Sequence, residues 1–265
     1  MSFKGSGEGR GKDEEKKGKR EGRDREKKRL REEDKDKKGD KKLKKIFVTA
    51  DGFVGSELKK AFKDNLTDDI KEADVIINTI GILKEDKHTF EESHVKAVEK
   101  LLPYKDKKLI HISALGSKKN HPSRYKHTKA ISEEIIKQNF KNYAILKPSI
   151  ILGEGQQLYK DLEKFKNLPL ILVPKMKVQP IEIEKLTGFV KRIINEDIKG
   201  EFELCGEEVI SMKKLFEAVF QRFGKKLLVI EAPKWVFRVL LPVLNALKIM
   251  TKDEYLMIED NICKG

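Results

Sequence analysis

Cysteine and tryptophan are nearly absent from this sequence of 265 residues, which contains two cysteines and one tryptophan. Cys205 and Cys263 are too few for a disulfide framework or a cysteine-based metal site, so we expect a reducing compartment and no bound metal. An uninterrupted apolar run of 18 residues is also missing. Lys234, Arg238 and Lys248 interrupt the most hydrophobic stretch, and the sequence therefore predicts no transmembrane helix.

Large apolar residues are scarce in residues 1–43, which consist almost wholly of Lys, Arg, Glu, Asp and Gly. Such a segment cannot bury enough apolar surface to offset its ordering entropy, so we expect a disordered charged tail. Through Lys45 the sequence has 20 basic and 12 acidic residues, which accounts for +8 of the formal charge of +14. Aromatic residues for stacking on bases are not interleaved with these charges, and we do not expect nucleic acid as a partner.

The spacing within LIHISALGSKKNHPSRYKHTK, residues 109–129, carries the most chemical information. An apolar, strand-like run ends before Ser113, and Tyr125 opens a helical pattern that contains Lys129. Side chains at i and i+4 share one helical face, so the Lys129 ammonium could lower the pKa of the phenol, which is ordinarily near ~10 and too high for a base at neutral pH. Ser113 would hold a carbonyl oxygen against that phenol. The alternative is an aromatic anchor beside a solvated lysine.

A glycine-containing turn opens the ordered part of the chain, in KKIFVTADGFVGSELKKAF. A buried strand is predicted over Ile46–Val48 and a helix over Ser56–Phe62, while Thr49, Gly52 and Gly55 occupy the three positions of a GxxGxxG turn. This context is typical of dinucleotide binding, in which the backbone approaches a pyrophosphate and the helix N-terminus offers free N–H groups. Thr49 stands where a glycine is expected, which predicts weaker phosphate binding. A purely structural turn is the alternative.

Further apolar strands and amphipathic helices alternate along the chain. Strands are predicted over residues 73–80, 109–112 and 143–152, and helices over 90–102 and 125–138. Their alternation predicts a parallel, doubly wound sheet. His88 and His94 lack the spacing of metal ligands, so we expect them to lie on the surface or to cap the first of these helices.

Taken together, these stretches resemble the extended short-chain dehydrogenase/reductase superfamily, of the NAD-dependent epimerase/dehydratase type. HISALGS and SRYKHTKAISEEII look most similar to the atypical branch that includes the nucleotide-binding accessory subunit of respiratory complex I. The resemblance covers Lys44 to about Asn261. It implies catalysis by Ser113, Tyr125 and Lys129, and binding of NAD or NADP. The cofactor contacts that it implies are Thr49, Gly52, Phe53, Val54, Gly55, Asn65, Leu66, Asn78, Gly81, Lys129, Pro148 and Ser149.

The nucleotide-binding half looks abbreviated beside that family. Only about 20 residues separate Gly55 from the strand that ends at Asn78, where the family has two further strands and a helix. The residue that would choose between NAD and NADP cannot be located. We therefore expect an α/β fold with an abbreviated Rossmann-like sheet in residues 44–153 and a smaller substrate-side domain in residues 154–265, partly interleaved with the first.

Three functions remain open at this stage. The chain could be an oxidoreductase or epimerase that acts on a small carbonyl or hydroxyl substrate of unknown identity. It could be a non-catalytic accessory or assembly subunit of a membrane complex, or a degenerate homologue that binds no cofactor. The intact Ser113, Tyr125 and Lys129 favour the enzyme, whereas Thr49 and the missing strands favour the other two.

Pro233–Met250 is the most hydrophobic stretch and bears on the partners of the chain. It is predicted to form a pair of helices that closes the smaller domain, and the alternative is a surface that docks on a membrane or on a membrane-associated protein. We expect a cytoplasmic location, with a place at the inner face of a membrane as the alternative. The sequence does not define an oligomeric state.

Overall fold

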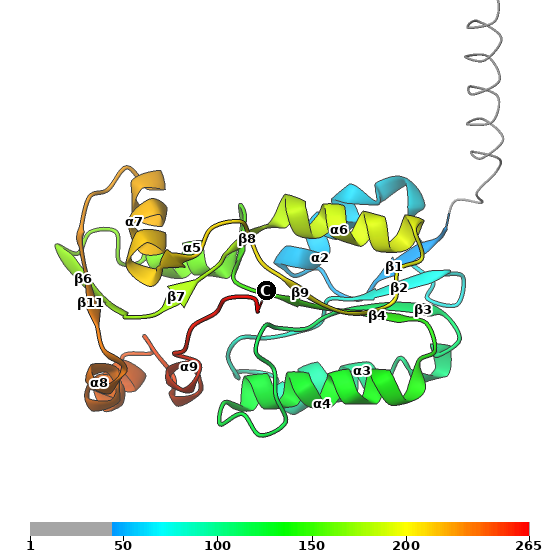
Figure 1. The fold of residues 1–265 in the computed structure, drawn as a ribbon, viewed down its shortest axis with the longest axis horizontal. Coiled ribbons are helices and arrows are strands. Elements are labelled where there is room, and N and C mark those ends of the chain that lie inside the picture. Colours follow the sequence, from blue (N-terminus) through cyan, green and yellow to red (C-terminus); the bar gives the residue numbers. More distant parts are fainter. Residues whose placement is uncertain (1–43, 265) are drawn as a thin grey trace, which may run out of the picture. The chain divides into compact units, whose positions relative to one another are not determined.

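The computed structural model describes residues 44–264, and the chain divides after Lys44 into two units. The charged tail predicted for residues 1–43 lies outside the described residues. The body that follows contains a parallel five-stranded sheet at its centre (Figure 1). The strands are β1 (Ile46–Val48), β2 (Val75–Asn78), β3 (Lys108–Ile112), β4 (Tyr143–Pro148) and β9 (Gly200–Leu204), in the order β1-β2-β3-β4-β9.

Helices cover both faces of this sheet, which is why β2 and β3 are buried at every position. On one face lie α2 (Phe53–Ala61) and α6 (Ile183–Asn195), whose Leu58, Val190 and Ile193 pack on β1, β2 and β4. On the other lie α4 (Arg124–Asn139) and a short helical segment. That segment comprises a π-helical turn, η2 (Glu91–Lys96), then α3 (Ala97–Glu99) and the 3-10 turn η3 (Leu102–Tyr104). The predicted Rossmann-like, doubly wound α/β class is confirmed.

β1 forms one margin of the sheet, and its outer edge shows how the first half is abbreviated. After α2 the chain makes a 3-10 turn, η1 (Lys63–Asn65), and a single bridge between Leu66 and Ile46. It then returns to start β2, which pairs with the inner edge of β1. Within the described residues no strand lies between α2 and β2, so the expected loss of the intervening strands and helix is confirmed.

The second half of the body contains three two-stranded sheets and five of its helices, but it also returns β9 to the central sheet. The small sheets pair β5 (Ile151–Leu152) with β8 (Ile181–Glu182), β6 (Leu170–Pro174) with β11 (Leu228–Ala232), and β7 (Lys177–Val178) with β10 (Ile210–Ser211). In addition to α6, the helices of this half are α5 (Gln157–Glu163), α7 (Met212–Arg222), α8 (Lys234–Ala246) and α9 (Lys252–Leu256). Ser211 is the N-cap of α7, and its side chain accepts a hydrogen bond from the Lys214 N–H.

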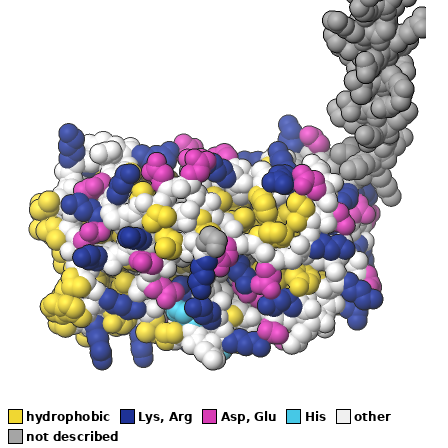
Figure 2. Space-filling view, in the orientation of Figure 1, with side chains coloured by type: hydrophobic (Ala, Val, Ile, Leu, Met, Phe, Trp, Pro, Cys, Tyr) yellow, Lys and Arg dark blue, Asp and Glu magenta, His cyan; other side chains and the backbone are white. Residues whose placement is uncertain are grey.

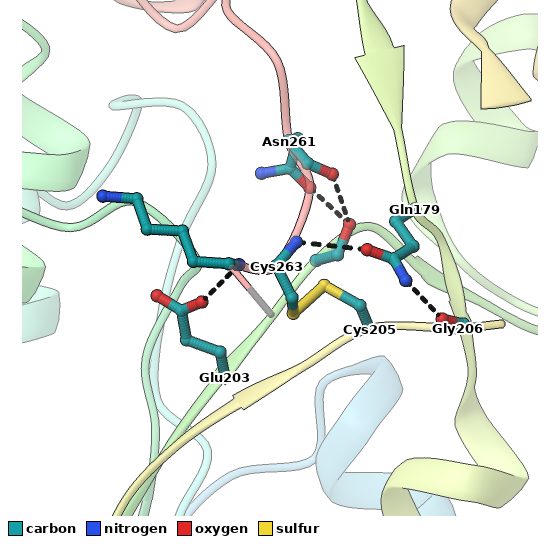
Figure 3. Close-up of a disulfide and its surroundings, with 8 residues drawn as sticks. Gln179, Glu203, Cys205, Gly206, Asn261 and Cys263 are labelled. Carbon is teal, nitrogen blue, oxygen red and sulfur yellow. Dashed lines mark hydrogen bonds between the residues drawn. A yellow bond between two sulfur atoms is a disulfide. The ribbon is translucent and has the colours of Figure 1, made fainter. Parts of the chain in front are cut away.

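Cys205 and Cys263 form a disulfide (Figure 3), whereas the sequence predicted no disulfide framework and a reducing compartment. Cys205 follows β9, and the C-terminal segment carries Cys263 alongside β7. That segment is held there by backbone hydrogen bonds of Asn261 with Lys177 and Gln179. The two thiols are 58 residues apart in sequence, so their proximity depends on the tertiary fold.

Removing this disulfide should destabilise the body, because the bond restricts the unfolded chain. Cys263→Ser is expected to lower the free energy of unfolding by about 2–4 kcal/mol in urea titrations. With reductant, the free energy of unfolding of the wild-type chain should fall to that of the variant. The free energy of unfolding of the variant should not change with reductant. Equal stability of oxidised wild type and variant would show that the link does not form in solution.

Candidate functional site

The turn between β1 and α2 leaves space in front of a helix N-terminus. Gly52 is the N-cap of α2, and no side chain caps this end. A Cβ atom built on Gly52 would meet nothing within 4 Å, whereas one on Gly55 would lie 1.9 Å from the carbonyl oxygen of Ala50. Gly55 is therefore required for the close packing of α2 on the turn. The open side at Gly52 leaves the N–H groups of Phe53 and Val54, in the first turn of α2, able to face an anion.

Thr49 replaces the first glycine of the motif without straining the backbone. Within residues 44–264, residues other than glycine adopt a positive φ only at Asp197 and Lys248. The Thr49 hydroxyl donates to Asn78 Oδ1 at 3.1 Å and accepts from the Thr79 N–H at 3.0 Å. This side chain therefore joins the carboxyl ends of β1 and β2, which a glycine could not do.

A chain of buried polar groups continues from Asn78 across the strand ends. The Asn78 amide lies 3.1 Å from His111 Nδ1, and His111 Nε2 lies 3.3 Å from the Ser132 hydroxyl, which donates to the Lys129 carbonyl. Burial and then the nearby Lys129 charge hold the pKa of His111 well below its usual value. A neutral His111 that accepts from Asn78 and donates to Ser132 satisfies every partner. The network ties β1, β2 and β3 to α4.

Lys129 is buried at the carboxyl end of β3. Its ammonium donates to the Ile112 carbonyl at 3.0 Å, and burial lowers its pKa to about 8, with Glu133 opposing the shift. A Cβ atom on Gly81 would lie 3.0 Å from Lys129 Nζ. The absence of a side chain there lets the segment that follows β2 pass beside the ammonium. Asn78, Gly81 and Lys129 are thus brought together.

Tyr125 is a half-buried residue in the first turn of α4, and its ring packs edge-on against His94 and Phe90, with centroids 5.3 and 5.8 Å apart. Burial, and then the charge of Asp253, raise the pKa of Tyr125 to about 12. This corrects the expected direction, in which Lys129 would lower that pKa. In the chain alone the phenol is fully protonated at neutral pH.

Ser113 is used internally by a buried ionic network that sequence reasoning missed. Its hydroxyl donates to Glu133, whose carboxylate also pairs with Lys147 at 2.9 Å. Burial would lower the pKa of Lys147, but hydrogen bonds to Glu201 and Glu133 outweigh it and raise that pKa. One signal could have found the network. Tyr125, Lys129 and Glu133 are spaced at i, i+4 and i+8, which puts a carboxylate on the same inward face of α4.

His94 is buried, so the expectation of a surface or capping histidine is wrong there, whereas His88 is exposed. The His94 ring nitrogen Nδ1 lies 2.8 Å from the Thr128 hydroxyl, and His94 Nε2 accepts a hydrogen bond from the Ile82 N–H at 3.4 Å. Burial, then Lys129, lower the pKa of His94 to about 3. The π-helical turn η2 buries Ser93, His94 and Val95 in succession, a pattern that a regular helical period does not give.

Asp253, another residue that sequence reasoning missed, caps α4 from the C-terminal helix α9. Its carboxylate accepts from the Ser123 hydroxyl at 2.8 Å, from the Arg124 N–H at 2.6 Å and from the Tyr125 N–H at 3.3 Å. A carboxylate at a helix N-terminus satisfies free donors and complements the helix dipole. The position of Tyr125 therefore depends on a residue 128 positions later in the sequence.

The structure places the remaining candidate contacts at the end of β4 and beside the start of β1. Pro148 ends β4, and the hydroxyl of the buried Ser149 donates to Asn261 of the C-terminal segment. Asn65 and Leu66 lie beside Ile46, at the amino end of β1. The glycine turn follows the carboxyl end of the same strand, so the structure does not bring these two residues to it.

Residues 24–185 match the family described as Male sterility protein, an NAD-binding family. The chain belongs to this NAD-binding family. Among curated proteins it is 23% identical over 200 residues to the mitochondrial NADH-ubiquinone oxidoreductase 40 kDa subunit of Neurospora crassa, covering 72% of this chain and 53% of that protein. It is 26% identical over 186 residues to the mitochondrial NADH dehydrogenase [ubiquinone] 1 alpha subcomplex subunit 9 of Arabidopsis thaliana, covering 64% and 46%. The chain thus spans about half the length of these relatives.

Solved structures show where the fold of this family member recurs. The dTDP-4-dehydrorhamnose reductase of Bacillus anthracis, in complex with NADP, superposes with a TM-score of 0.61 at 15% identity, covering 73% of this chain and 85% of that one. The UDP-glucuronic acid 4-epimerase of Bacillus cereus, in complex with UDP-glucuronic acid and NAD, gives 0.57 at 18% identity, covering 71% and 86%. At these identities the likeness establishes the fold, and the resemblance to the reductase and epimerase superfamily is confirmed.

The residues of this NAD-binding family member fit part of a dinucleotide. The uncapped N-terminus of α2 beside Gly52 suits a pyrophosphate, and the Lys129 ammonium beside Gly81 suits ribose hydroxyls. The outer edge of β1 carries only the Leu66 bridge, where the family would supply the strand that contacts the adenosine ribose. The fit is therefore good at the pyrophosphate and reduced at the adenosine.

The buried Lys129 should leave a signature in the pH dependence of stability. Its pKa is about 8 in the folded chain and 10.5 for an unperturbed lysine, so between these values the unfolded chain binds the additional proton. Stability is then expected to rise with pH from 8 towards 10, by a total on the order of 3 kcal/mol.

Lys129→Met should remove this rise, whereas Lys96→Met, which changes an exposed lysine, should keep it. Denaturant titrations at pH 7 to 10 check this expectation. The upper limit avoids the opposite effect of Tyr125, whose raised pKa costs stability above pH 10. If the free energy of unfolding changed with pH in the same way for wild type and Lys129→Met, the burial of a charged lysine would be contradicted.

Proposed function

We propose that the chain binds NAD or NADP across the carboxyl ends of β1 to β3 and is an oxidoreductase or epimerase acting on a carbonyl or hydroxyl group. The observation that carries this proposal is the buried Lys129 ammonium, held on the Ile112 carbonyl beside Gly81 and one turn along α4 from Tyr125. Burial of a charged group is costly and is typical of functional sites. Membership of an NAD-binding family also supports the binding of NAD or NADP.

The cofactor would supply or accept the hydride, and the chain would supply position and a proton. The N-terminus of α2 would hold the pyrophosphate, and Lys129 would bind the nicotinamide ribose. A phenol with a pKa of about 12 is a proton donor at neutral pH, so Tyr125 suits the reduction of a carbonyl, in which its hydroxyl protonates the oxygen. Ser113 would orient that oxygen after exchanging its hydrogen bond to Glu133 for one to the substrate.

A second function is a non-catalytic, nucleotide-binding subunit of a membrane assembly. Ser113 and Ser149 are both engaged within the chain, by Glu133 and Asn261. The curated relatives are named as subunits of NADH-ubiquinone oxidoreductase and NADH dehydrogenase. In this function Lys129 and the glycine turn would still hold the cofactor, and Tyr125 would have no proton to transfer.

Tyr125→Phe separates the two functions, because it removes only the hydroxyl. With NADPH or NADH and a set of nucleotide-linked keto sugars, beginning with dTDP-4-dehydrorhamnose, the wild type should oxidise the cofactor. The variant should be slower by about 100-fold or more while cofactor affinity stays unchanged.

Tyr104→Phe, in η3, is the matched control and should keep the wild-type rate. Turnover by Tyr125→Phe at the wild-type rate would refute the catalytic role. Cofactor binding without oxidation by any keto sugar of the set would favour the accessory subunit.

A further inference from the structure

The outer face of α8 is apolar and uncovered within residues 44–264. Trp235, Val239 and Val243 recur every four residues along it, and their exposed fractions are 66, 69 and 58%. Leu247, directly after the helix, continues the row at 63% exposure. The inner face of α8 is apolar as well, since Phe237 packs there in the core that contains Ile258. α8 thus carries apolar side chains on two faces, of which only the inner one is covered within the described residues.

The small sheet that precedes α8 exposes an apolar face of its own. Leu170 and Leu172 of β6 pair in register with Leu228 and Ile230 of β11, so the four side chains share one face. Their exposed fractions lie between 38 and 58%. The alternate residues, including Val173 and Val229, form the buried core on the other face. Parallel sheets are generally covered on both faces, so this one lacks a cover within the described residues.

The two elements that carry these faces are consecutive in the chain, since β11 ends at Ala232 and α8 begins at Lys234. Figure 2 shows hydrophobic side chains gathered at the end of the body that carries β6, β11 and α8. We call this surface the apolar end. Its members are Leu170, Leu172, Leu228, Ile230, Trp235, Val239, Val243 and Leu247.

The charge on α8 and on the turn that follows it has a single sign. From Ala232 to Lys252 the sequence contains no Asp or Glu, but it contains Lys234, Arg238, Lys248 and Lys252. Lys234 donates to the Ile258 carbonyl. Arg238 and Lys248 are exposed and form no ion pair within the described residues. An apolar surface bordered by unpaired cations complements a surface that is both apolar and anionic.

Other covers fit this surface less well. Residues 1–43 contain few apolar side chains, so that part of the sequence has little with which to cover it. A symmetric contact between two copies would place this basic surface against the same basic surface, which like charges oppose. Tryptophan beside basic residues is characteristic of helices that lie in a lipid interface. No helix in residues 44–264 is both long and apolar enough to cross a membrane, so contact would be with its surface.

We propose that the apolar end docks on an anionic lipid surface, with α8 lying in the interface. Trp235, Val239, Val243 and Leu247 enter the boundary between headgroups and acyl chains, and the apolar face of β6 and β11 lies against it. Arg238 and Lys248 reach the anionic headgroups. This docking does not depend on cofactor binding or on catalysis, so it can succeed or fail independently of the proposed function.

Trp235 is the only tryptophan in the chain, so its emission reports directly on the apolar end. The full chain is mixed with phosphatidylcholine vesicles that either lack phosphatidylglycerol or contain about 30% of it. With the anionic vesicles the emission should shift to the blue and become protected from acrylamide, and the neutral vesicles should give a weaker response. Adhesion through the basic residues 1–43 alone would sediment the chain without moving the emission.

Two variants and a control locate the contact. Val239→Asp with Val243→Asp changes exposed positions, so the fold should persist, and vesicle affinity should fall by about tenfold or more. Val209→Asp, which changes a valine that is 49% exposed between β9 and β10, should bind like wild type. Arg238→Glu with Lys248→Glu should remove the preference for anionic over neutral vesicles.

Four results would overturn the proposal. One is sedimentation with anionic vesicles while Trp235 emission stays unchanged. Another is wild-type affinity of the Val239→Asp, Val243→Asp variant. The third is protection of Trp235 from acrylamide in the absence of vesicles, found in a protein that has the mass of a dimer. That result would show that a second copy covers the apolar end. Absence of vesicle binding altogether would leave a protein partner as its cover and would equally refute a lipid surface.

Discussion

The burial of the Lys129 ammonium at the carboxyl end of β3 determines the arrangement of the rest of the site. A charge removed from water needs an acceptor, and the Ile112 carbonyl at the end of the strand supplies it. That bond holds the inner face of α4 against the sheet, so Glu133 on the same face is buried too and requires Ser113 and Lys147 as partners. Burial, and then the same positive charge, lower the pKa of His94 to about 3, so that it packs as a neutral ring beside Tyr125.

The C-terminal segment completes the site from the other side of the sequence. Asp253 caps the helix that carries Tyr125, Glu259 pairs with Lys126, and Asn261 takes the hydrogen bond of Ser149. The disulfide then attaches Cys263 to the end of β9. Residues 253–263 therefore hold the start of α4 and the end of β4, and they also pack against α8 through Ile258. The catalytic candidates and the apolar end are thus connected through one short segment.

The sequence predicted the parts of this structure that depend on local pattern. The glycine turn between β1 and α2 and the shared helical face of Tyr125 and Lys129 both follow from spacing. What it could not predict depends on burial and on distant partners. His94 turns inward because a π-helical turn breaks the regular period. The pKa of Tyr125 rises because burial and Asp253 act on the phenol. Cys205 lies next to Cys263 because β9 pairs with β4 in the central sheet, which is a tertiary contact.

The central claim is that this abbreviated sheet still binds a nicotinamide dinucleotide, and calorimetric titration of the full chain with NAD, NADH, NADP and NADPH tests it most directly. The space beside Gly52 and the ammonium beside Gly81 predict saturable binding of at least one of the four at one molecule per chain. The sparse outer edge of β1 predicts that the adenosine contributes little to this affinity. No saturable heat from any of the four dinucleotides would contradict the account.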